Sequence, residues 1–242
     1  MTLIEGATYH RINAVKEGVE FAIQAADQDR TLSAEQVLVA TGRKPNTNGL
    51  GLECVGVPLS SNGAIQVDEF QATSNPDIYA TGDVTGRDMF VYMAAHGGRI
   101  AAENAMQGHS SRYDGKAIPA VVFSDPQVAT VGLTEAQAKS KGYNVKTSVL
   151  YFDKVPRALA ARDLRGLIKL VADRDTDQLL GVHILAPEGA DSIQTGVLAI
   201  HQGLTTQKLG SMIFPYLTTV EGLKLAAQTF EKDVTQLSCC AG

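Results

Sequence analysis

Several features that mark particular classes of protein are missing from this sequence. Its three cysteines, one isolated and two adjacent, cannot form a disulfide framework. It has no basic block and a net charge of −5, so we expect no nucleic-acid partner. Its apolar runs are far shorter than a membrane span, so we expect no membrane partner either.

The N-terminal residues also lack a targeting signal. The start, M-T-L-I-E-G-A, has no basic segment followed by an apolar core, so no secretory signal is predicted. Together with the unpaired cysteines, this indicates a protein of the reducing cytoplasm. The chain enters a β-rich segment almost at once, and we therefore expect Met1 to be an internal methionine of a longer protein.

The first part of the chain is rich in predicted β-structure. Two partly alternating segments, Ala7–Ile12 and Val19–Gln24, flank the turn residues Lys16–Gly18 and predict a hairpin. The continuous apolar run Gln36–Ala40 predicts a strand that is covered on both faces. In the loop-rich stretch that follows, Cys54 is expected to be a small apolar residue, buried or half-buried.

A carboxylate follows the next predicted strand. The pattern predicts a short strand at Ile78–Ala80, then Asp83, then a helix at Phe90–Met106. In α/β folds, an acid after a strand and a nearby helix N-terminus are where polar cofactors bind, because the acid accepts hydrogen bonds from hydroxyls and the helix offers free N–H groups. At this point, a helix-capping role for Asp83 is an equally good interpretation.

The C-terminal half predicts a mixed α/β domain. Thr134 and Gln137 have the spacing of a capping box, which predicts a helix to about Lys141. Strands are predicted at 145–152, 166–172 and 179–185, and a helix at 190–202. His183, in the last of these strands, and His201, near the helix end, are expected to be structural.

The last segment, Phe214–Gly242, combines a helical apolar pattern with two terminal thiols. Between Phe214 and Phe230 it predicts an apolar face that a second copy of the chain would cover, giving a homodimer. Cys239 and Cys240 form a pair of soft ligands suited to a soft metal ion. From the pair alone, ordinary reduced thiols without a function are the slightly better interpretation.

Three motifs resemble one enzyme family. Thr73–Asp83, T-S-N-P-D-I-Y-A-T-G-D, is similar to the second flavin motif of the pyridine nucleotide–disulfide oxidoreductases. Ala40–Asn46, A-T-G-R-K-P-N, resembles the segment that leads out of the family's nicotinamide domain. Ile118–Gly132 resembles the opening of its dimerisation domain, so the resemblance covers essentially the whole chain.

The resemblance implies an α/β fold in which partial FAD- and NAD(P)-binding domains precede an α/β dimerisation domain. Residues 1–44 would be the C-terminal remnant of the NAD(P)-binding domain, 45–116 the returning part of the FAD-binding domain and 117–242 the dimerisation domain. Asp83 would bind the ribityl chain of FAD, and Val91 would present its backbone N–H to the isoalloxazine. NADPH would reduce the FAD.

The resemblance also implies a substrate. Most of the family has H-P-T-x-x-E in the dimerisation domain, whose histidine protonates a thiol leaving group. Here the matching Y-L-T-T-V-E places Tyr216 at that position, with Glu221 in register. With the terminal S-C-C-A-G, this is similar to the branch of the family that reduces Hg(II) to Hg(0). In that branch Cys239 and Cys240 would receive Hg(II) from thiolate complexes and deliver it, and Tyr216 would line the inner metal site.

Two alternatives remain open. The sequence lacks the G-x-G-x-x-G fingerprints for FAD and NADPH and the C-x-x-x-x-C redox pair, which lie upstream in the family. We therefore expect a C-terminal half that does not turn over alone. One alternative is a thiol-disulfide reductase of the same family, against which Tyr216 argues. The other is a non-catalytic metal-binding or dimerisation module.

Overall fold

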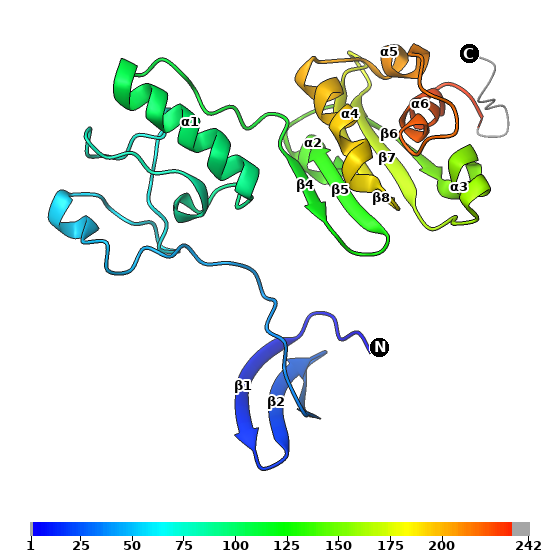
Figure 1. The fold of residues 1–242 in the computed structure, drawn as a ribbon. Helices are drawn as coiled ribbons and strands as arrows, with labels where there is room; N and C mark the ends of the chain where they lie inside the picture. The colour runs from blue at the N-terminus through cyan, green and yellow to red at the C-terminus, as the bar shows by residue number, and fades with distance from the viewer. Residues whose placement is uncertain (1, 234–242) are drawn as a thin grey trace. The chain divides into compact units, whose positions relative to one another are not determined.

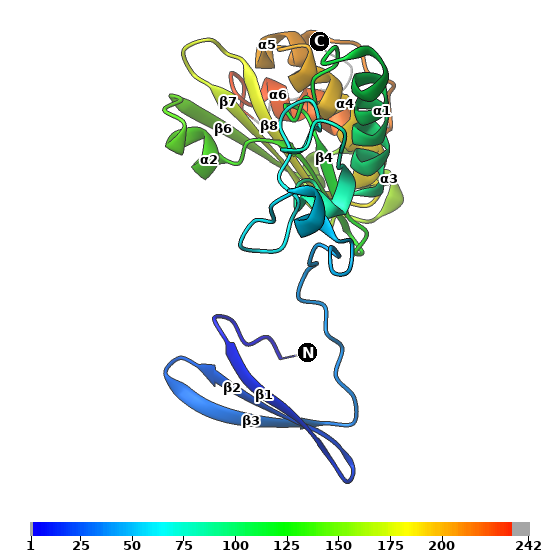
Figure 2. The same ribbon diagram turned by 90° about the vertical axis from the view of Figure 1, so that its left-hand side faces the viewer.

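The computed structural model describes residues 2–233, and the chain divides into two compact units, Met1–Pro45 and Asn46–Gly242 (Figure 1). The first unit is an antiparallel sheet of β1 (Thr8–Val15), β2 (Gly18–Ala25) and β3 (Gln28–Ala34), in that order. Figure 2 shows the three strands side by side. The predicted hairpin is confirmed. Strand β3 was not predicted, because its sequence, QDRTLSA, contains only one large apolar residue.

The prediction of a covered strand at Gln36–Ala40 is wrong. This run is extended but belongs to neither described sheet, and Leu38 is 90% exposed. An apolar run forms a strand only when neighbouring backbone satisfies its N–H and C=O groups. In the first unit the strand next to this run, β3, pairs with β2 alone, so no described strand offers that ladder.

The second unit begins with a loop-rich region around a small core of Val57, Ile65 and Ala80. Its regular elements are η1 (Leu52–Val55), η2 (Gly82–Thr85) and α1 (Val91–Gln107). The helix confirms the prediction for 90–106 within a residue at each end. The predicted strand at Ile78–Ala80 is wrong, because only one isolated bridge, Ala72 to Tyr79, forms there.

Cys54 is exposed, which corrects the expectation that it is at least half-buried. It lies in η1, a single 3₁₀ turn in which every side chain is exposed or only partly buried. A short surface turn between Gly51 and Gly56, both with positive φ, has no second layer to cover it. Small size and low polarity made burial of this cysteine plausible, but its position in the turn decides its exposure.

The rest of the second unit is a five-stranded antiparallel sheet in the order β4-β5-β8-β7-β6. Its strands are β4 (Pro119–Val122), β5 (Gln127–Gly132), β6 (Val145–Tyr151), β7 (Leu167–Asp173) and β8 (Leu179–Ala186). The continuous sheet confirms the three predicted strands. Strands β7 and β8 lie in the middle and are almost entirely buried, as their apolar runs require.

Short helices surround this sheet. They are α2 (Glu135–Ser140), α3 (Pro156–Ala161), α4 (Gly189–His201), α5 (Thr206–Ser211) and α6 (Glu221–Gln228), with the 3₁₀ turn η3 (Phe152–Lys154) before α3. The main core joins the sheet to α4, α5 and α6, whereas α2 packs through Ala138 on Val171 and Leu180 in a separate cluster. The predicted capping box of Thr134 and Gln137 is present. Among residues 2–233, no helix is long and apolar enough to cross a membrane.

The apolar pattern between Phe214 and Phe230 forms core rather than surface. Leu223, Leu225 and Ala226 of α6 are fully or almost fully buried against the sheet. The exposed apolar side chains lie before the helix instead, at Met212, Ile213, Tyr216 and Leu217. The expectation of an apolar outer face over the whole segment is therefore wrong for α6 and limited to the loop that leads into it.

Candidate functional site

Tyr216 lies in the loop between α5 and α6, and its side chain is 59% exposed. The next residue, Leu217, has φ +62°, a left-handed conformation that is unfavourable for a branched side chain. The Thr218 hydroxyl donates to the Pro215 carbonyl at 2.8 Å and accepts from the Glu221 N–H at 3.3 Å. These bonds close the loop around Tyr216 into a turn.

The buried carboxylate of Glu221 holds this turn from the inside. Glu221 is 2% exposed, and its Oε2 accepts from the Leu217 N–H at 3.2 Å. A buried carboxylate needs such donors, because it loses its hydration on folding. The bond fixes the backbone directly after Tyr216. The structure thus brings together two residues that the sequence placed in one motif.

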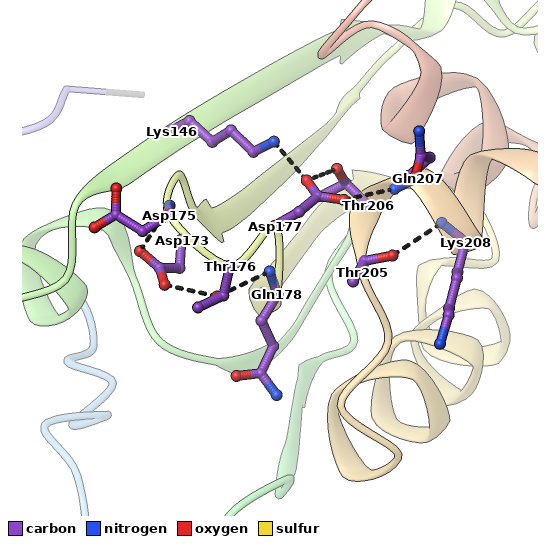
Figure 3. Close-up of polar contacts among 10 residues, drawn as sticks. All are labelled: Lys146, Asp173, Asp175, Thr176, Asp177, Gln178, Thr205, Thr206, Gln207 and Lys208. Atoms are coloured by element: carbon purple, nitrogen blue, oxygen red, sulfur yellow. Dashed lines mark hydrogen bonds and ion pairs between the residues drawn. The ribbon is translucent and has the colours of Figure 1, made fainter.

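The two helices that flank the Tyr216 loop are themselves anchored to the sheet. The Asp177 carboxylate, in the β7–β8 turn, accepts from Lys146 Nζ, from the Thr206 hydroxyl and from the Gln207 N–H at the start of α5 (Figure 3). Burial would raise the pKa of Asp177, but the hydrogen bonds from Lys146 and Thr206 lower it below its ordinary value. Gln228 of α6 donates to the Gly210 carbonyl at 2.9 Å and joins the two helices.

Asp83 lies in η2 and not at the end of a strand, which corrects the prediction. Its side chain is exposed. Residues just after it, Thr85 to Arg87, line a surface hollow of about 500 Å³ together with 60–62 and 64–67. The exposed carboxylate therefore remains available to a hydroxyl-bearing ligand.

Helix α1 begins at Val91, whose side chain is 84% exposed. The N-cap residue is Phe90, and no described side chain caps the helix. The first N–H groups of a helix have no intrahelical acceptor, so this end can donate to an anionic ligand. The Asp83 carboxylate can accept hydrogen bonds from hydroxyls and the Val91 N–H can donate one, which together fit a cofactor with both hydroxyls and an electron-rich ring.

Two glycines allow the loop before Asp83 to lie directly against α1. Gly82 has φ +74°, and a Cβ there would lie 2.9 Å from the Ala94 Cβ. A Cβ on Gly97 would lie 2.0 Å from the Thr81 Oγ1, a buried hydroxyl with no hydrogen-bond partner among the described residues. This contact was not predicted from the sequence. The glycines of Thr81-Gly82-Asp83 and of Gly97-Gly98 were its signal, because a residue without a side chain lets two backbones approach closely.

The candidate residues thus form two groups and not one site. Asp83 precedes Val84, which packs against the small core, whereas Tyr216 lies between Phe214 and Val220, which pack against the main core. Among residues 2–233, no group of three His, Cys, Asp or Glu side chains is arranged to hold a metal ion. Cys239 and Cys240 lie outside the described residues, so their delivery role stays a prediction.

His183 has a structural role, as predicted. It is half-buried in β8, and its Nε2 lies 3.2 Å from the Leu133 carbonyl oxygen. Burial lowers its pKa below the ordinary value. A half-buried histidine that contacts a neighbouring backbone carbonyl in this way supports the sheet.

Comparisons with known proteins agree with the motifs. The model of the pyridine nucleotide-disulphide oxidoreductases matches residues 1–105, and that of their dimerisation domain matches residues 118–227. The chain is 48% identical to the mercuric reductase of Lysinibacillus sphaericus over all 242 residues, which are 44% of that protein. It is 54% identical to the mercuric reductase of Acidithiobacillus ferrooxidans over 211 residues, 87% of this chain and 38% of that one.

Solved structures give the same picture at lower identity. The HOCl-induced flavoprotein disulfide reductase RclA from Escherichia coli superposes with a TM-score of 0.80 at 28% identity, over 93% of this chain and 51% of that one. LpdA from Mycobacterium tuberculosis superposes with a TM-score of 0.81 at 27% identity, over 93% and 49%. The chain spans less than half the length of the two curated relatives described above.

Proposed function

The chain belongs to the pyridine nucleotide-disulphide oxidoreductase family, and from this we propose that it is part of a mercuric reductase, which reduces Hg(II) to Hg(0) with NADPH through FAD. The observation that carries the proposal is the identity of 47–48% to three mercuric reductases over all 242 residues. The reduced thiols that this chemistry requires fit a cytoplasmic enzyme.

Tyr216 supports this substrate over an organic disulfide. A phenol has an ordinary pKa near 10, so it is poorly suited to protonate a leaving thiolate at neutral pH. Reduction of an Hg(II) ion held between thiolates requires no such protonation. An exposed tyrosine on a turn that Glu221 anchors would instead line the metal site.

Cys239 and Cys240 are proposed to capture Hg(II) and deliver it. Hg(II) is a soft ion, and soft thiolate ligands suit it. Two adjacent thiols can bind one ion together, whereas Cys54 offers a single sulfur. The ion would arrive as a complex with small thiols and be transferred by ligand exchange.

The residues of the loop-rich region would hold the flavin. The exposed Asp83 carboxylate would accept a hydrogen bond from a ribityl hydroxyl, and the Val91 N–H would donate to the ring. FAD, when bound, supplies the electron transfer from NADPH to the substrate. The match to a dimerisation domain and the exposed Ile213, Tyr216 and Leu217 favour a homodimer in which a second copy covers this loop.

The test is a fusion enzyme in which this chain replaces the aligned segment of the L. sphaericus mercuric reductase. The fusion should contain FAD and oxidise NADPH when Hg(II) is added with excess thiol, with release of Hg(0). Tyr216→Phe should lower that turnover about tenfold, the effect of losing one polar contact of about 1.4 kcal/mol. Tyr151→Phe, which removes the hydroxyl of an equally exposed tyrosine on β6, is the matched control.

Three outcomes separate the alternatives. Hg(II)-dependent turnover with no reduction of glutathione disulfide supports the proposal. Efficient disulfide reduction without Hg(II) turnover would favour a disulfide reductase, the activity named for the E. coli structural relative. A fusion that binds FAD and reduces a dye with NADPH, but turns over neither substrate, would leave only a metal-binding or dimerisation role for this chain.

A further inference from the structure

Glu188 has an unfavourable backbone conformation at the start of α4. Its φ is +58°, in the left-handed region that glycine and asparagine adopt more readily. Its carbonyl oxygen accepts from the N–H groups of Asp191 and Ser192 in the first turn of the helix. Its side chain, however, makes no cap bond to α4. Since the backbone of Glu188 is strained and its side chain does not cap α4, we expect a role of this side chain in another segment.

The side chain of Glu188 reaches the Tyr216 turn. The Thr219 hydroxyl donates to Glu188 Oε2 at 3.2 Å, a contact between residues 31 positions apart. Thr219 itself is 7% exposed. The segment from Pro215 to Glu221 is therefore held by two carboxylates, with Glu221 on the Leu217 N–H and Glu188 on the Thr219 hydroxyl.

The space beside this contact is a cavity and not packed side chains. A cavity of about 220 Å³ is lined by Glu188 and Thr219, and on its other sides by η3, α3 and the residues that follow α3. Because side chains do not fill this volume, packing alone does not support that side of the turn. The hydrogen bond from Thr219 to Glu188 then restrains it.

We propose that Glu188 is a positioning residue for Tyr216, acting through Thr219, and this rests on the proposed function. A residue that lines a metal site must be held within about 0.5 Å of its productive position. Glu221 fixes the backbone directly after Tyr216. The Thr218 hydroxyl and the Thr219 carbonyl close the next turn toward α6, but their partners lie within the same segment or at the start of α6. The bond between Glu188 and Thr219 restrains that part and ties it to the start of α4.

The experiment uses three variants of the fusion enzyme. Thr219→Val removes the donor and keeps the shape of the side chain. Glu188→Gly removes the acceptor and at the same time relieves the strain, since glycine adopts φ +58° freely. Glu188→Gln keeps an amide oxygen that accepts the same bond. Thr219→Val and Glu188→Gly should each lower kcat for Hg(II) about fivefold, and their combination should be no worse than either. Glu188→Gln should restore most of kcat.

Two measurements report structural damage in the variants. One is the reduction of a dye directly by the flavin, and the other is the thermal midpoint of unfolding. Glu188→Gly should keep dye reduction and should not lower the thermal midpoint. The proposal is overturned if Thr219→Val and Glu188→Gly keep the full kcat for Hg(II), or if both lose dye reduction in the same proportion. It is also overturned if the double variant shows the product of the two single effects.

Failure of the proposed function would be seen separately, as absence of Hg(II) turnover in the unsubstituted fusion that still reduces the dye. Hydrogen exchange of the peptide 212–224 tests the positioning in that case too. Faster exchange at Leu217 in Thr219→Val and Glu188→Gly, but not in Glu188→Gln, supports restraint of the turn by Glu188. Unchanged exchange in all three variants refutes it.

Discussion

The contact between α1 and the loop before Asp83 gives a prediction with its own internal control. A Cβ added at Gly97 would lie 2.0 Å from the Thr81 Oγ1 and 3.3 Å from the Gln71 Oε1. A Cβ added at the adjacent Gly98 would meet only the Thr81 Cγ2, at 4.0 Å. Both positions are inside the same helix, so replacement by alanine gives both the same gain in helix propensity, about 1 kcal/mol.

The difference between Gly97→Ala and Gly98→Ala is therefore the overpacking penalty alone. Such penalties are about 1–3 kcal/mol in packed interiors. We expect Gly98→Ala to raise the free energy of unfolding. The free energy of unfolding of Gly97→Ala should be about 1–3 kcal/mol lower than that of Gly98→Ala. Urea unfolding of the fusion enzyme, followed by circular dichroism, measures both values. Gly97→Ala should also retain less FAD, because the displaced loop carries Asp83.

Removal of the clashing atom provides the rescue. Thr81→Ala deletes the buried, unpartnered hydroxyl, so by itself it should have little effect on stability. Combined with Gly97→Ala, it should recover most of the lost free energy, because the nearest remaining atoms lie 3.3 Å away. If Gly97→Ala is as stable as Gly98→Ala, the close packing of this loop on α1 is wrong, and with it the geometry inferred for the flavin site.

Other predictions concern the capping box, the surface ion pairs and the thiols. Thr134→Ala should lower the free energy of unfolding by about 1 kcal/mol through loss of the N-cap of α2; no loss in urea unfolding would mean that α2 is held by packing alone. Hydrogen bonds from Lys139 and Lys169 lower the pKa of Glu135 from 4.5 to about 2 in the folded chain. The ionised Glu135 therefore stabilises the fold fully above about pH 4.5, and this stabilisation is lost as the pH falls toward 2. Glu135→Gln should make the thermal midpoint less dependent on pH between pH 5 and pH 2, and an unchanged pH dependence would contradict the role of the two lysines. Cys54, being exposed, should react at once with a thiol reagent under native conditions. Replacing both Cys239 and Cys240 with alanine should abolish tight Hg(II) binding, measured by titration, while Cys54→Ala leaves it; persistence of tight binding in the double variant would contradict the delivery role.

The sequence predicted well those elements that are specified by a pattern within their own residues. Strands β6, β7 and β8 and helix α4 follow directly from their runs, and the capping box of α2 is a local interaction of four residues. The motif around Tyr216 and Glu221 could also be read along the chain, because the two residues meet within one turn. Such elements depend on short-range spacing, which a sequence displays directly.

The failures occurred where a partner outside the segment decides the outcome. Gln36–Ala40 has the composition of a buried strand, but no described strand pairs with it. Ile78–Ala80 likewise pairs only through a single bridge, and Cys54 is exposed because it lies in a short turn at the surface. Strand β3 shows the reverse case, since a polar sequence became a strand once β2 offered it a full ladder.

By itself, the sequence determined the family, the elements with a strong local pattern and the chemical types of the candidate residues, because these are properties of motifs and of neighbouring positions. Only the tertiary structure decided that Gly97 gives room to Thr81, and that Glu188 at the start of α4 meets Thr219 beside Tyr216. Both contacts join segments separated by many residues, at positions set by the packing of whole helices. A distance of that kind depends on how the chain returns upon itself, and no local pattern specifies it.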